Sequence, residues 1–498
     1  MSRRLTILAS FILLLFAVVA AQSANIQFFR ASALDASSIN PRVSSSSTIY
    51  PRGEIVAADG TVLAQSVAQS SGYYPYKRVY PLGSLTSGVV GFSSPSYGVW
   101  ALEAQYNSVL TAHAQPPQSF AQVLAPTSAA DSITLTLQPS LQRVIQKAMG
   151  GVDGAVVVLD PRSGGVLAMY SNPTYNPVPL TSSSFPVAAA AWKKDTTNNA
   201  HGFPPLGLVA TQQTFPPGST FKIVTTSAVV VGRPDLFLKS YPVLRTTKLP
   251  NTNLTLSNYG FESCGGNIPE MLPPSCDTGY ALLGLDVGGS LMSSTASSFG
   301  INQVPPLDLP GVVSSYFPPA SAFQYDLPGL AYSSIGQKNV RLTALQNALV
   351  AAAVANGGRE MTPHLLDYIT APDGSTVKRY QASVWQTPLT PAQAARIVPL
   401  MQNVVSRGTA YGIFPANLDV AAKTGTSQTG NSAKNTDDWM IAFAPATHPT
   451  IAVAVVIPFQ PVSQTGASVA GPIIKCAVEG ALAVQAGLPA SGTATTCP

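Results

Sequence analysis

The sequence predicts an α+β fold in which one antiparallel sheet is flanked by helices. Three observations support this prediction. A hairpin pattern spans residues 154–171, helical patterns occupy the middle of the chain, and three strand patterns followed by a helix close it. Two further parts precede this domain: an apolar N-terminal segment, and a mainly β region rich in Ser, Pro and Gly that ends near residue 150.

The N-terminus reads MSRR and continues with seventeen uncharged, mostly apolar residues, Leu5–Ala21. This run is long for the core of a signal peptide and short but adequate for a membrane-spanning helix. Arg3 and Arg4 favour a cytoplasmic start. Ala21-Gln22-Ser23 has the small residues of a cleavage site, so an anchored and a cleaved form both remain open. In either form the rest of the chain is exported.

The later elements follow from hydrophobic periodicity. From Asp131 an alternating strand pattern leads into a helix that ends at Gly150-Gly151. Residues 154–171, GAVVVLDPRSGGVLAMYS, have two β-rich runs around a turn sequence. Residues 215–231, FPPGSTFKIVTTSAVVV, are predicted as a helix entered through Pro216-Pro217-Gly218. The remaining elements are helices at 342–358 and 390–406, strands at 418–428, 437–445 and 450–459, and a closing helix at 471–487.

Charge is sparse along the whole chain. Charged residues make up 10% of it and the net charge is +5, whereas ordinary soluble proteins contain roughly 25% charged residues. No run of Lys and Arg is longer than two residues, which excludes a nucleic-acid-binding function. A low charge count also limits self-repulsion when carboxylates take up protons, so we keep an acidic habitat as a hypothesis.

The four cysteines, Cys264, Cys276, Cys476 and Cys497, fit an oxidising compartment, in which four cysteines allow three disulfide connectivities. Sequence proximity favours Cys264–Cys276 and Cys476–Cys497. The chain has no CxxC pair and no His cluster, so a metal site is not expected.

A serine and a lysine one helical turn apart give the first candidate for chemistry. Ser219 and Lys222 would share one face near the N-terminus of the predicted helix. The helix dipole and the apolar surroundings would lower the pKa of Lys222. A neutral lysine can take the proton of Ser219 and so activate a nucleophile without histidine. Alone, this SxxK spacing is a weak signal.

Two further segments complete the candidate site. Lys423-Thr424-Gly425-Thr426 lies in a predicted strand, where glycine lets another backbone approach and where a strand edge can pair with a peptide. The alternative is an ordinary exposed edge strand protected by a lysine. In PSCDTGY, Ser275 and Asp277 flank Cys276; alone, this segment is more typical of a helix cap.

The order SxxK, SxD and KTG, with Ser275 following Ser219 by 56 residues and Lys423 following Ser275 by 148, is typical of penicillin-binding proteins and β-lactamases. The chain resembles the class B penicillin-binding proteins, the monofunctional peptidoglycan transpeptidases, and among them most resembles the actinobacterial penicillin-binding protein A type. Segments similar to family signatures include PRGEIVAADGTVLAQS (51–66), RVYPLGSLTSGVVGF and GVWALEAQYNSVL (within 78–110), SIGQKNVRLTALQNA and DDWMIAFAP.

The resemblance implies a role for each candidate. Ser219 attacks the carbonyl between the two D-alanines of a stem peptide, Lys222 is the base, and Ser275 passes the proton to the leaving amine. Lys423 orients Ser275 and supplies positive charge. The carboxylate of the substrate is bound by Thr424 and Thr426, which flank Gly425, and the N–H groups of Ser219 and Thr426 form the oxyanion hole. Penicillin would bind covalently to the same serine, and the reaction would need no metal or organic cofactor.

The resemblance also implies an organisation for the whole chain. It predicts a cytoplasmic stub (1–4), an uncleaved signal-anchor transmembrane helix (5–24), an elongated, mainly β pedestal (25–150), a transpeptidase domain (151–489) and a C-terminal tail (490–498). The protein would then be a single-pass cell-membrane protein whose catalytic domain is extracytoplasmic. Its expected partners are peptidoglycan stem peptides, β-lactams as inhibitors and a membrane-embedded glycosyltransferase of the shape–elongation–division family.

One residue departs from the family pattern. Most members carry Asn at the position of Asp277; an amide both accepts and donates, whereas an ionised carboxylate only accepts and would raise the pKa of Lys222. We therefore expect weaker acylation by β-lactams and a pH optimum that changes with Asp277. Two alternatives stay open: a D,D-carboxypeptidase or β-lactamase-type hydrolase, and a non-catalytic scaffold or β-lactam sensor.

Overall fold

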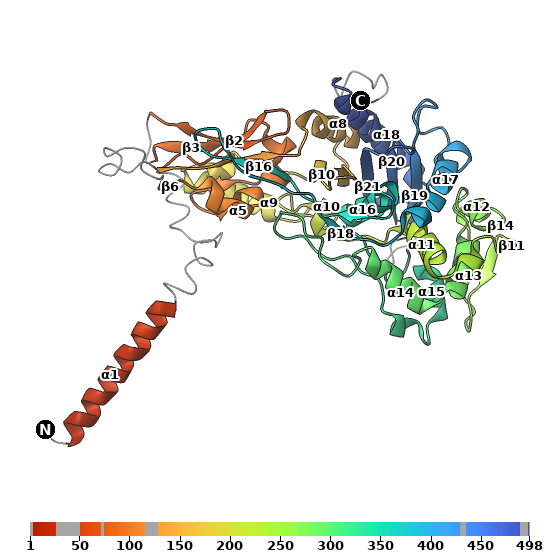
Figure 1. Cartoon of the computed structure of the whole chain (residues 1–498), viewed down its shortest axis with the longest axis horizontal. Coiled ribbons are helices and arrows are strands. Elements are labelled where there is room, and N and C mark those ends of the chain that lie inside the picture. Colours follow the sequence, from red (N-terminus) through yellow and green to blue (C-terminus); the bar gives the residue numbers. More distant parts are fainter. Residues whose placement is uncertain are drawn as a thin grey trace.

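The structure is a computed structural model that describes residues 3–25, 50–70, 74–114, 128–428, 435–488 and 497. The predicted cytoplasmic stub lies partly outside these residues, and so does the C-terminal tail, of which only Cys497 is described. The first element, α1 (Arg3–Ala24), stands apart from the other elements in Figure 1.

The helix α1 exposes apolar side chains around its whole circumference, among them Phe11, Leu13 and Phe16. Its apolar stretch of described residues is Ser10–Ser23. Among the described helices, α18 (Gly466–Gln485) is the one with the length and composition of a membrane span, but 56% of its apolar window is buried inside the fold. We therefore interpret α18 as a core helix.

Residues 154–461 contain a five-stranded antiparallel sheet in the order β10-β9-β21-β20-β19. Its strands are β9 (Gly154–Leu159), β10 (Val166–Asn172), β19 (Ala421–Gln428), β20 (Asn435–Ala444) and β21 (Ile451–Pro461). The predicted hairpin, the three consecutive strands and the closing helix are all confirmed. The strand β19 lies at one edge of the sheet, and no strand of the described residues pairs with its outer side.

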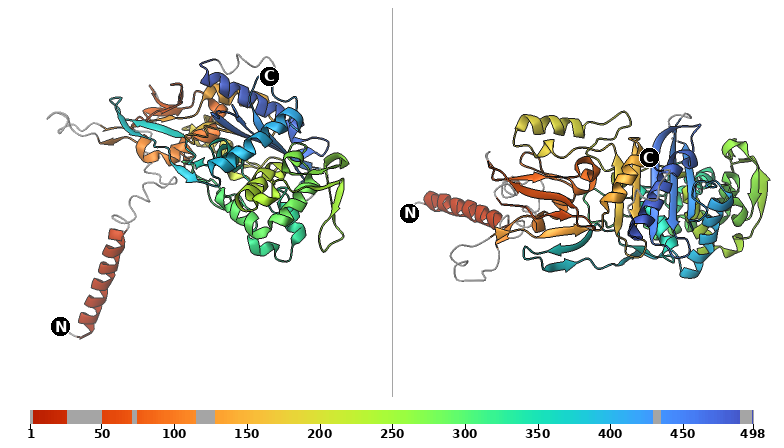
Figure 2. Two further views of the ribbon diagram at one scale, coloured as in Figure 1. Left: turned by 45° about the vertical axis from the view of Figure 1, so that its right-hand side comes forward. Right: turned by 90° about the horizontal axis from the view of Figure 1, so that it is seen from above.

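Both faces of this sheet are covered, because β20 and β21 are buried at nearly every position. The helices α8 (Pro139–Met149) and α18 pack together against it. In a second group, α17 (Pro391–Arg407) packs against both α11 (Lys222–Gly232) and α16 (Ala344–Ala355). The arrangement of helices around the sheet is visible from two sides in Figure 2. The predicted α+β class is thus confirmed.

Smaller elements extend the side of the sheet that carries β19. They include α13 (Asp277–Val287), α14 (Gly289–Ser298) and α15 (Leu327–Ser333), and two small two-stranded sheets, β11 (Tyr241–Leu244) with β14 (Cys264–Gly266) and β12 (Thr246–Lys248) with β13 (Thr255–Ser257). Residues 241–266, here called the flap, lie beside α13 at one end of the molecule in Figure 1. Both predicted disulfides are confirmed, Cys264–Cys276 and Cys476–Cys497.

The N-terminal region has its own six-stranded sheet in the order β17-β16-β8-β1-β2-β3. Its strands are β1 (Ile55–Val56), β2 (Val62–Ala68), β3 (Tyr76–Val79), β8 (Ser132–Leu135), β16 (Leu366–Thr370) and β17 (Thr376–Arg379). Two of these strands come from residues assigned above to the transpeptidase domain. Conversely, α8 was assigned to the pedestal and packs on α18. The domain boundary at residue 150 stays a prediction.

A buried charge cluster holds the N-terminal region together. The carboxylate of Glu103 accepts hydrogen bonds from Arg52 Nε at 2.7 Å, Arg78 Nε at 2.6 Å and the hydroxyl of Tyr80 at 3.0 Å. Burial alone would raise the pKa of Glu103, but the two guanidinium groups outweigh it and hold this pKa below its ordinary value. The segments compared above with the family, 51–66 and 78–110, meet in this cluster.

Candidate active site

Ser219 lies in the segment that precedes α11, and contacts with the sheet hold the backbone of this segment. The predicted single helix at 215–231 is in fact a 3₁₀ turn, Gly218–Phe221, followed by α11. The carbonyl of Pro216 accepts from Trp439 Nε1 at 2.9 Å and from Ser427 Oγ at 2.6 Å. Pro216 is thereby tied to β19 and β20, which places Ser219 beside the edge strand.

Gly218 makes this close approach possible. It has a φ of 53°, a left-handed conformation that favours glycine. A Cβ atom at this position would lie 2.8 Å from the carbonyl oxygen of Thr426. Gly425 has the same function on the opposite side, because a Cβ there would lie 2.7 Å from the carbonyl oxygen of Pro217. The expectation that Gly425 lets another backbone approach is confirmed.

Lys222 begins α11 and is fully buried. Its Nζ donates to Ser275 O at 2.6 Å, to Asp277 Oδ1 at 2.7 Å and to Ser275 Oγ at 3.2 Å. Burial lowers the pKa of Lys222, since the ammonium form loses its hydration, while Asp277 opposes this effect. The net direction is toward the neutral amine that a general base requires.

Asp277 connects the lysine to the serine. Its Oδ1 accepts from Ser219 Oγ at 3.5 Å as well as from Lys222 Nζ. Within the described residues no hydrogen bond joins Ser219 directly to Lys222. The two side chains nevertheless face one space, because they share one carboxylate oxygen.

Lys423 reaches the same group from β19. Its Nζ donates to Ser275 Oγ at 2.8 Å and to the carbonyl of Thr424 at 2.9 Å. Lys423 is fully buried, and burial together with the nearby Lys222 holds its pKa well below the ordinary value. The hydroxyl of Ser275 therefore lies between two lysines, each of which can donate to it or, when neutral, accept from it.

The two threonines of the KTGT segment have separate contacts. Thr424 Oγ1 lies 2.5 Å from Thr409 Oγ1, and Thr426 Oγ1 accepts from the N–H of Gly466, the first residue of α18. Thr426 lies opposite Asp438 in the antiparallel pairing of β19 with β20. Carboxylate binding by these threonines and the oxyanion hole stay predictions.

Sequence reasoning missed several residues that support the site. The ring of Tyr280 lies 5.4 Å from Lys222 Nζ, and its hydroxyl is 2.8 Å from Thr226 Oγ1. The Oδ1 of Asn258 accepts a hydrogen bond from the N–H of Thr278, the residue after Asp277. Tyr280 follows Asp277 by three residues, so helical spacing could have indicated that the two share one face. Asn258 belongs to the flap, and no sequence pattern indicated its position beside Thr278. Within the described residues, no group of three or more His, Cys, Asp or Glu is placed to hold a metal ion.

Chemically, the arrangement offers a hydroxyl nucleophile, a buried amine of lowered pKa and a second hydroxyl flanked by two lysines. These groups lie beside a strand edge that can pair with an extended peptide. Such a set suits acyl transfer through a serine ester.

Comparison with protein families gives two matches. Residues 154–479 match the penicillin binding protein transpeptidase domain, and residues 52–130 match the penicillin binding protein A dimerisation domain. The first match alone covers more than half of the chain.

Individual relatives match over nearly the whole length. The chain is 34% identical to the peptidoglycan D,D-transpeptidase PbpA of Mycolicibacterium smegmatis, over 95% of this chain and 97% of that protein. The penicillin G acyl-enzyme complex of penicillin-binding protein A from M. tuberculosis has a TM-score of 0.78 at 32% identity, covering 87% of this chain and 99% of that one. A D,D-transpeptidase domain from Eggerthella lenta has a TM-score of 0.75 at 30% identity, covering 88% of this chain and 99% of that one.

Proposed function

Since this chain belongs to the class B penicillin-binding proteins, we propose that it is a peptidoglycan D,D-transpeptidase of the penicillin-binding protein A type. It cross-links stem peptides through a serine acyl-enzyme, and penicillin acylates the same serine. The convergence of Ser219, Lys222, Ser275, Asp277 and Lys423 in one hydrogen-bonded group carries this proposal.

In the acylation step, neutral Lys222 takes the proton of Ser219, directly or through the oxygen of Asp277 that both contact. The Oγ of Ser219 forms a bond to the carbonyl carbon between the two D-alanines, and the C–N bond to the terminal D-alanine breaks. Ser275, held by Lys222 and Lys423, delivers a proton to the leaving amine. The negative charge on the carbonyl oxygen is stabilised by the N–H groups of Ser219 and Thr426.

In the second step, an amine of a neighbouring stem peptide attacks the ester and releases Ser219. Before the first step, the terminal carboxylate of the donor peptide is held by Thr424 and Thr426, and Lys423 supplies positive charge beside it. The outer edge of β19 supports this role, because no described strand pairs with it and an extended peptide can be added at such an edge.

Water in place of the amine would make the protein a D,D-carboxypeptidase, so one experiment must separate the two. We would incubate the full-length protein with a thioester analogue of D-Ala-D-Ala and a D-amino acid, and analyse protein and products by mass spectrometry. Transfer to the D-amino acid supports the transpeptidase. Hydrolysis alone indicates a carboxypeptidase or β-lactamase-type enzyme, and the absence of any adduct indicates a scaffold or sensor.

We also propose that residues 5–24 are a single-pass membrane anchor and that the catalytic domain is extracytoplasmic. The apolar circumference of α1 supports the anchor, since a helix that is apolar on all sides is typical of a membrane span. Two disulfides support an oxidising compartment. A membrane-embedded glycosyltransferase of the shape–elongation–division family would then contact the anchor and the N-terminal region, which can be tested by co-purification of the two full-length proteins.

A further inference from the structure

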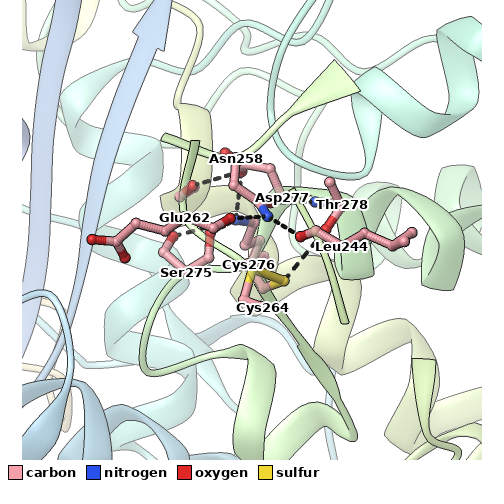
Figure 3. Close-up of a disulfide and its surroundings, with 10 residues drawn as sticks. Leu244, Asn258, Glu262, Cys264, Ser275, Cys276, Asp277 and Thr278 are labelled. Carbon is pink, nitrogen blue, oxygen red and sulfur yellow. Dashed lines mark hydrogen bonds and ion pairs between the residues drawn. A yellow bond between two sulfur atoms is a disulfide. The ribbon is translucent and has the colours of Figure 1, made fainter. Parts of the chain in front are cut away.

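The Cys264–Cys276 disulfide lies inside the proposed catalytic motif. Cys276 stands between Ser275 and Asp277 and immediately precedes the first residue of α13. Its partner Cys264 belongs to β14 of the flap, and the two Cα atoms are 5.7 Å apart. Figure 3 shows this disulfide with Ser275 and Asp277 beside it. The flap is therefore bonded covalently to the backbone that carries two residues of the site.

Asn258 makes a second tie between the flap and the same loop. Its Oδ1 accepts from the N–H of Thr278 at 2.9 Å, and its Nδ2 donates to the carbonyls of Leu244 at 2.7 Å and Glu262 at 2.8 Å. Asn258 is buried. The three bonds use the carbonyl oxygen and both N–H donors of the amide, so a side chain without an amide would lose at least one of them. These bonds are drawn in Figure 3.

The backbone of Ser275 needs such support. Ser275 has a φ of 62°, a backbone conformation that residues with a side chain rarely adopt. Such a conformation persists only where the surrounding structure imposes it. Its N–H donates to Leu272 O at 3.0 Å, and the N–H of Cys276 donates to Met271 O at 2.9 Å. In this conformation the carbonyl and the hydroxyl of Ser275 both reach Lys222.

The geometry points to Asn258 and the Cys264–Cys276 disulfide as positioning residues that hold Ser275 and Asp277 against Lys222 and Lys423. They act through the loop and do not touch the reacting atoms. This inference rests on the proposed function and extends it, since it makes the flap a working part of the active site.

General stabilisation is the competing explanation, and the chain supplies its own control. The Cys476–Cys497 disulfide closes a loop of comparable length, with a sequence separation of 21 against 12 for Cys264–Cys276. Constraint of the unfolded chain by the two bonds is therefore similar. Cys476 lies in α18, and its bond to Cys497 involves no residue of the proposed site.

The test compares three variants of the full-length protein with the wild type: Cys264→Ser/Cys276→Ser, Asn258→Ala and the control Cys476→Ser/Cys497→Ser. The readout is the rate constant for acylation by a fluorescent penicillin between pH 4 and pH 9. We expect the first two variants to lose at least about tenfold in rate, because small displacements of reacting groups are costly. The control variant should keep the wild-type rate.

The pH profile separates positioning from loss of folded protein. Lys222 faces Asp277, Lys423 and the ring of Tyr280. If Asp277 moves away, the pKa of Lys222 falls and the acid limb of the profile moves to lower pH, as it should in Asp277→Asn. A fraction of unfolded protein would lower the amount of labelled protein at every pH without moving the limb.

If the double-serine variant does not fold, the folded control variant, which keeps Cys264–Cys276 and lacks the other disulfide, is treated with a phosphine reductant and assayed at once. A lower rate and an acid limb at lower pH then give the same support. Equal rates in the wild type and in both flap variants, or in the control variant before and after reduction, would overturn the inference and leave the proposed function intact. A wild-type protein that no penicillin or thioester acylates would overturn both.

Discussion

The Nζ of Lys222 lies 2.7 Å from Oδ1 of Asp277, and the same oxygen accepts a hydrogen bond from Ser219. The base and the nucleophile of the proposed reaction thus meet on one carboxylate. A carboxylate stabilises the ammonium form of Lys222, which opposes the effect of burial on its pKa. This single contact leads to the first prediction.

Replacement of Asp277 by Asn should move the acid limb of the acylation profile to lower pH. The carboxylate raises the pKa of Lys222, so its removal lowers this pKa and leaves more neutral amine at a given pH. We expect a shift of about 1 to 3 pH units and faster acylation by penicillin at pH 7. Stopped-flow acylation across pH measures it, and the exposed Asp235→Asn is the control. An unchanged limb and rate would show that Asp277 does not tune Lys222.

Gly218→Ala should impair both stability and acylation. The new Cβ would overlap the carbonyl oxygen of Thr426 in a residue with positive φ. The control is Gly150→Ala, which has a similar φ of 55° and no atom within 4 Å of the new Cβ. We expect the control to lose roughly 1–2 kcal/mol of unfolding free energy. Gly218→Ala should lose more, and its acylation rate should be lower than that of the wild type by at least about tenfold. Equal losses of unfolding free energy in the two variants, measured by urea unfolding, would contradict the close approach of Gly218 to β19.

Asp438→Asn should stabilise the protein at alkaline pH. Asp438 is fully buried beside Thr426, and burial, with a smaller contribution from Asp437, raises the pKa of Asp438 to about 7. A carboxyl whose pKa is raised in the folded state favours folding at low pH and loses this contribution as the pH rises from about 4 through 7. The variant should therefore match the wild type at pH 4 and exceed its stability at pH 8 by about 1–3 kcal/mol.

Thermal unfolding at the two pH values measures this difference, with the exposed Asp59→Asn as control. A variant less stable than the wild type at pH 8 would show that the ionised carboxylate of Asp438 is satisfied in the fold. The expected trend would also agree with the acidic habitat considered from the composition.

Glu103→Gln should destabilise the N-terminal region by about 3–5 kcal/mol, because it leaves the buried Arg52 and Arg78 without their counter-charge. The pKa of Glu103 is lowered in the folded state, so its contribution is present above the ordinary carboxyl pKa and is lost as the pH falls through the folded value. The gap between the variant and the wild type should accordingly narrow in acid. The exposed Glu54→Gln is the matched control, and equal unfolding midpoints for the two variants would contradict the prediction.

Sequence patterns gave the sheet and most of its helices because these elements follow from local periodicity. Apolar runs are typical of buried strands, and β9, β20 and β21 have such runs. The helix α17 starts directly after its capping residue Thr390, which is a typical helix start. The pairing of β16 with β8 joins residues more than 200 apart, and no local pattern encodes it. The same holds for the buried contact of Glu103 with Arg52 and Arg78.

At the site, motif spacing identified Ser219, Lys222, Ser275, Asp277 and Lys423, which the structure brings together. Spacing did not reveal that Asp277 stands between Ser219 and Lys222, or that Ser275 has a left-handed backbone. These features depend on where the flap places the loop, and the contribution of Asn258 was hidden for the same reason.

The central claim is that an uncharged Lys222 removes the proton from Ser219, and acylation of the Lys222→Met variant tests it most directly. Wild type and variant are reacted with penicillin G, digested, and the peptide that contains Ser219 is weighed over time. The account predicts an adduct on Ser219 in the wild type and a rate lower by about 10² to 10⁴ in a folded variant. An adduct on another residue, or equal rates in the two proteins, would contradict it.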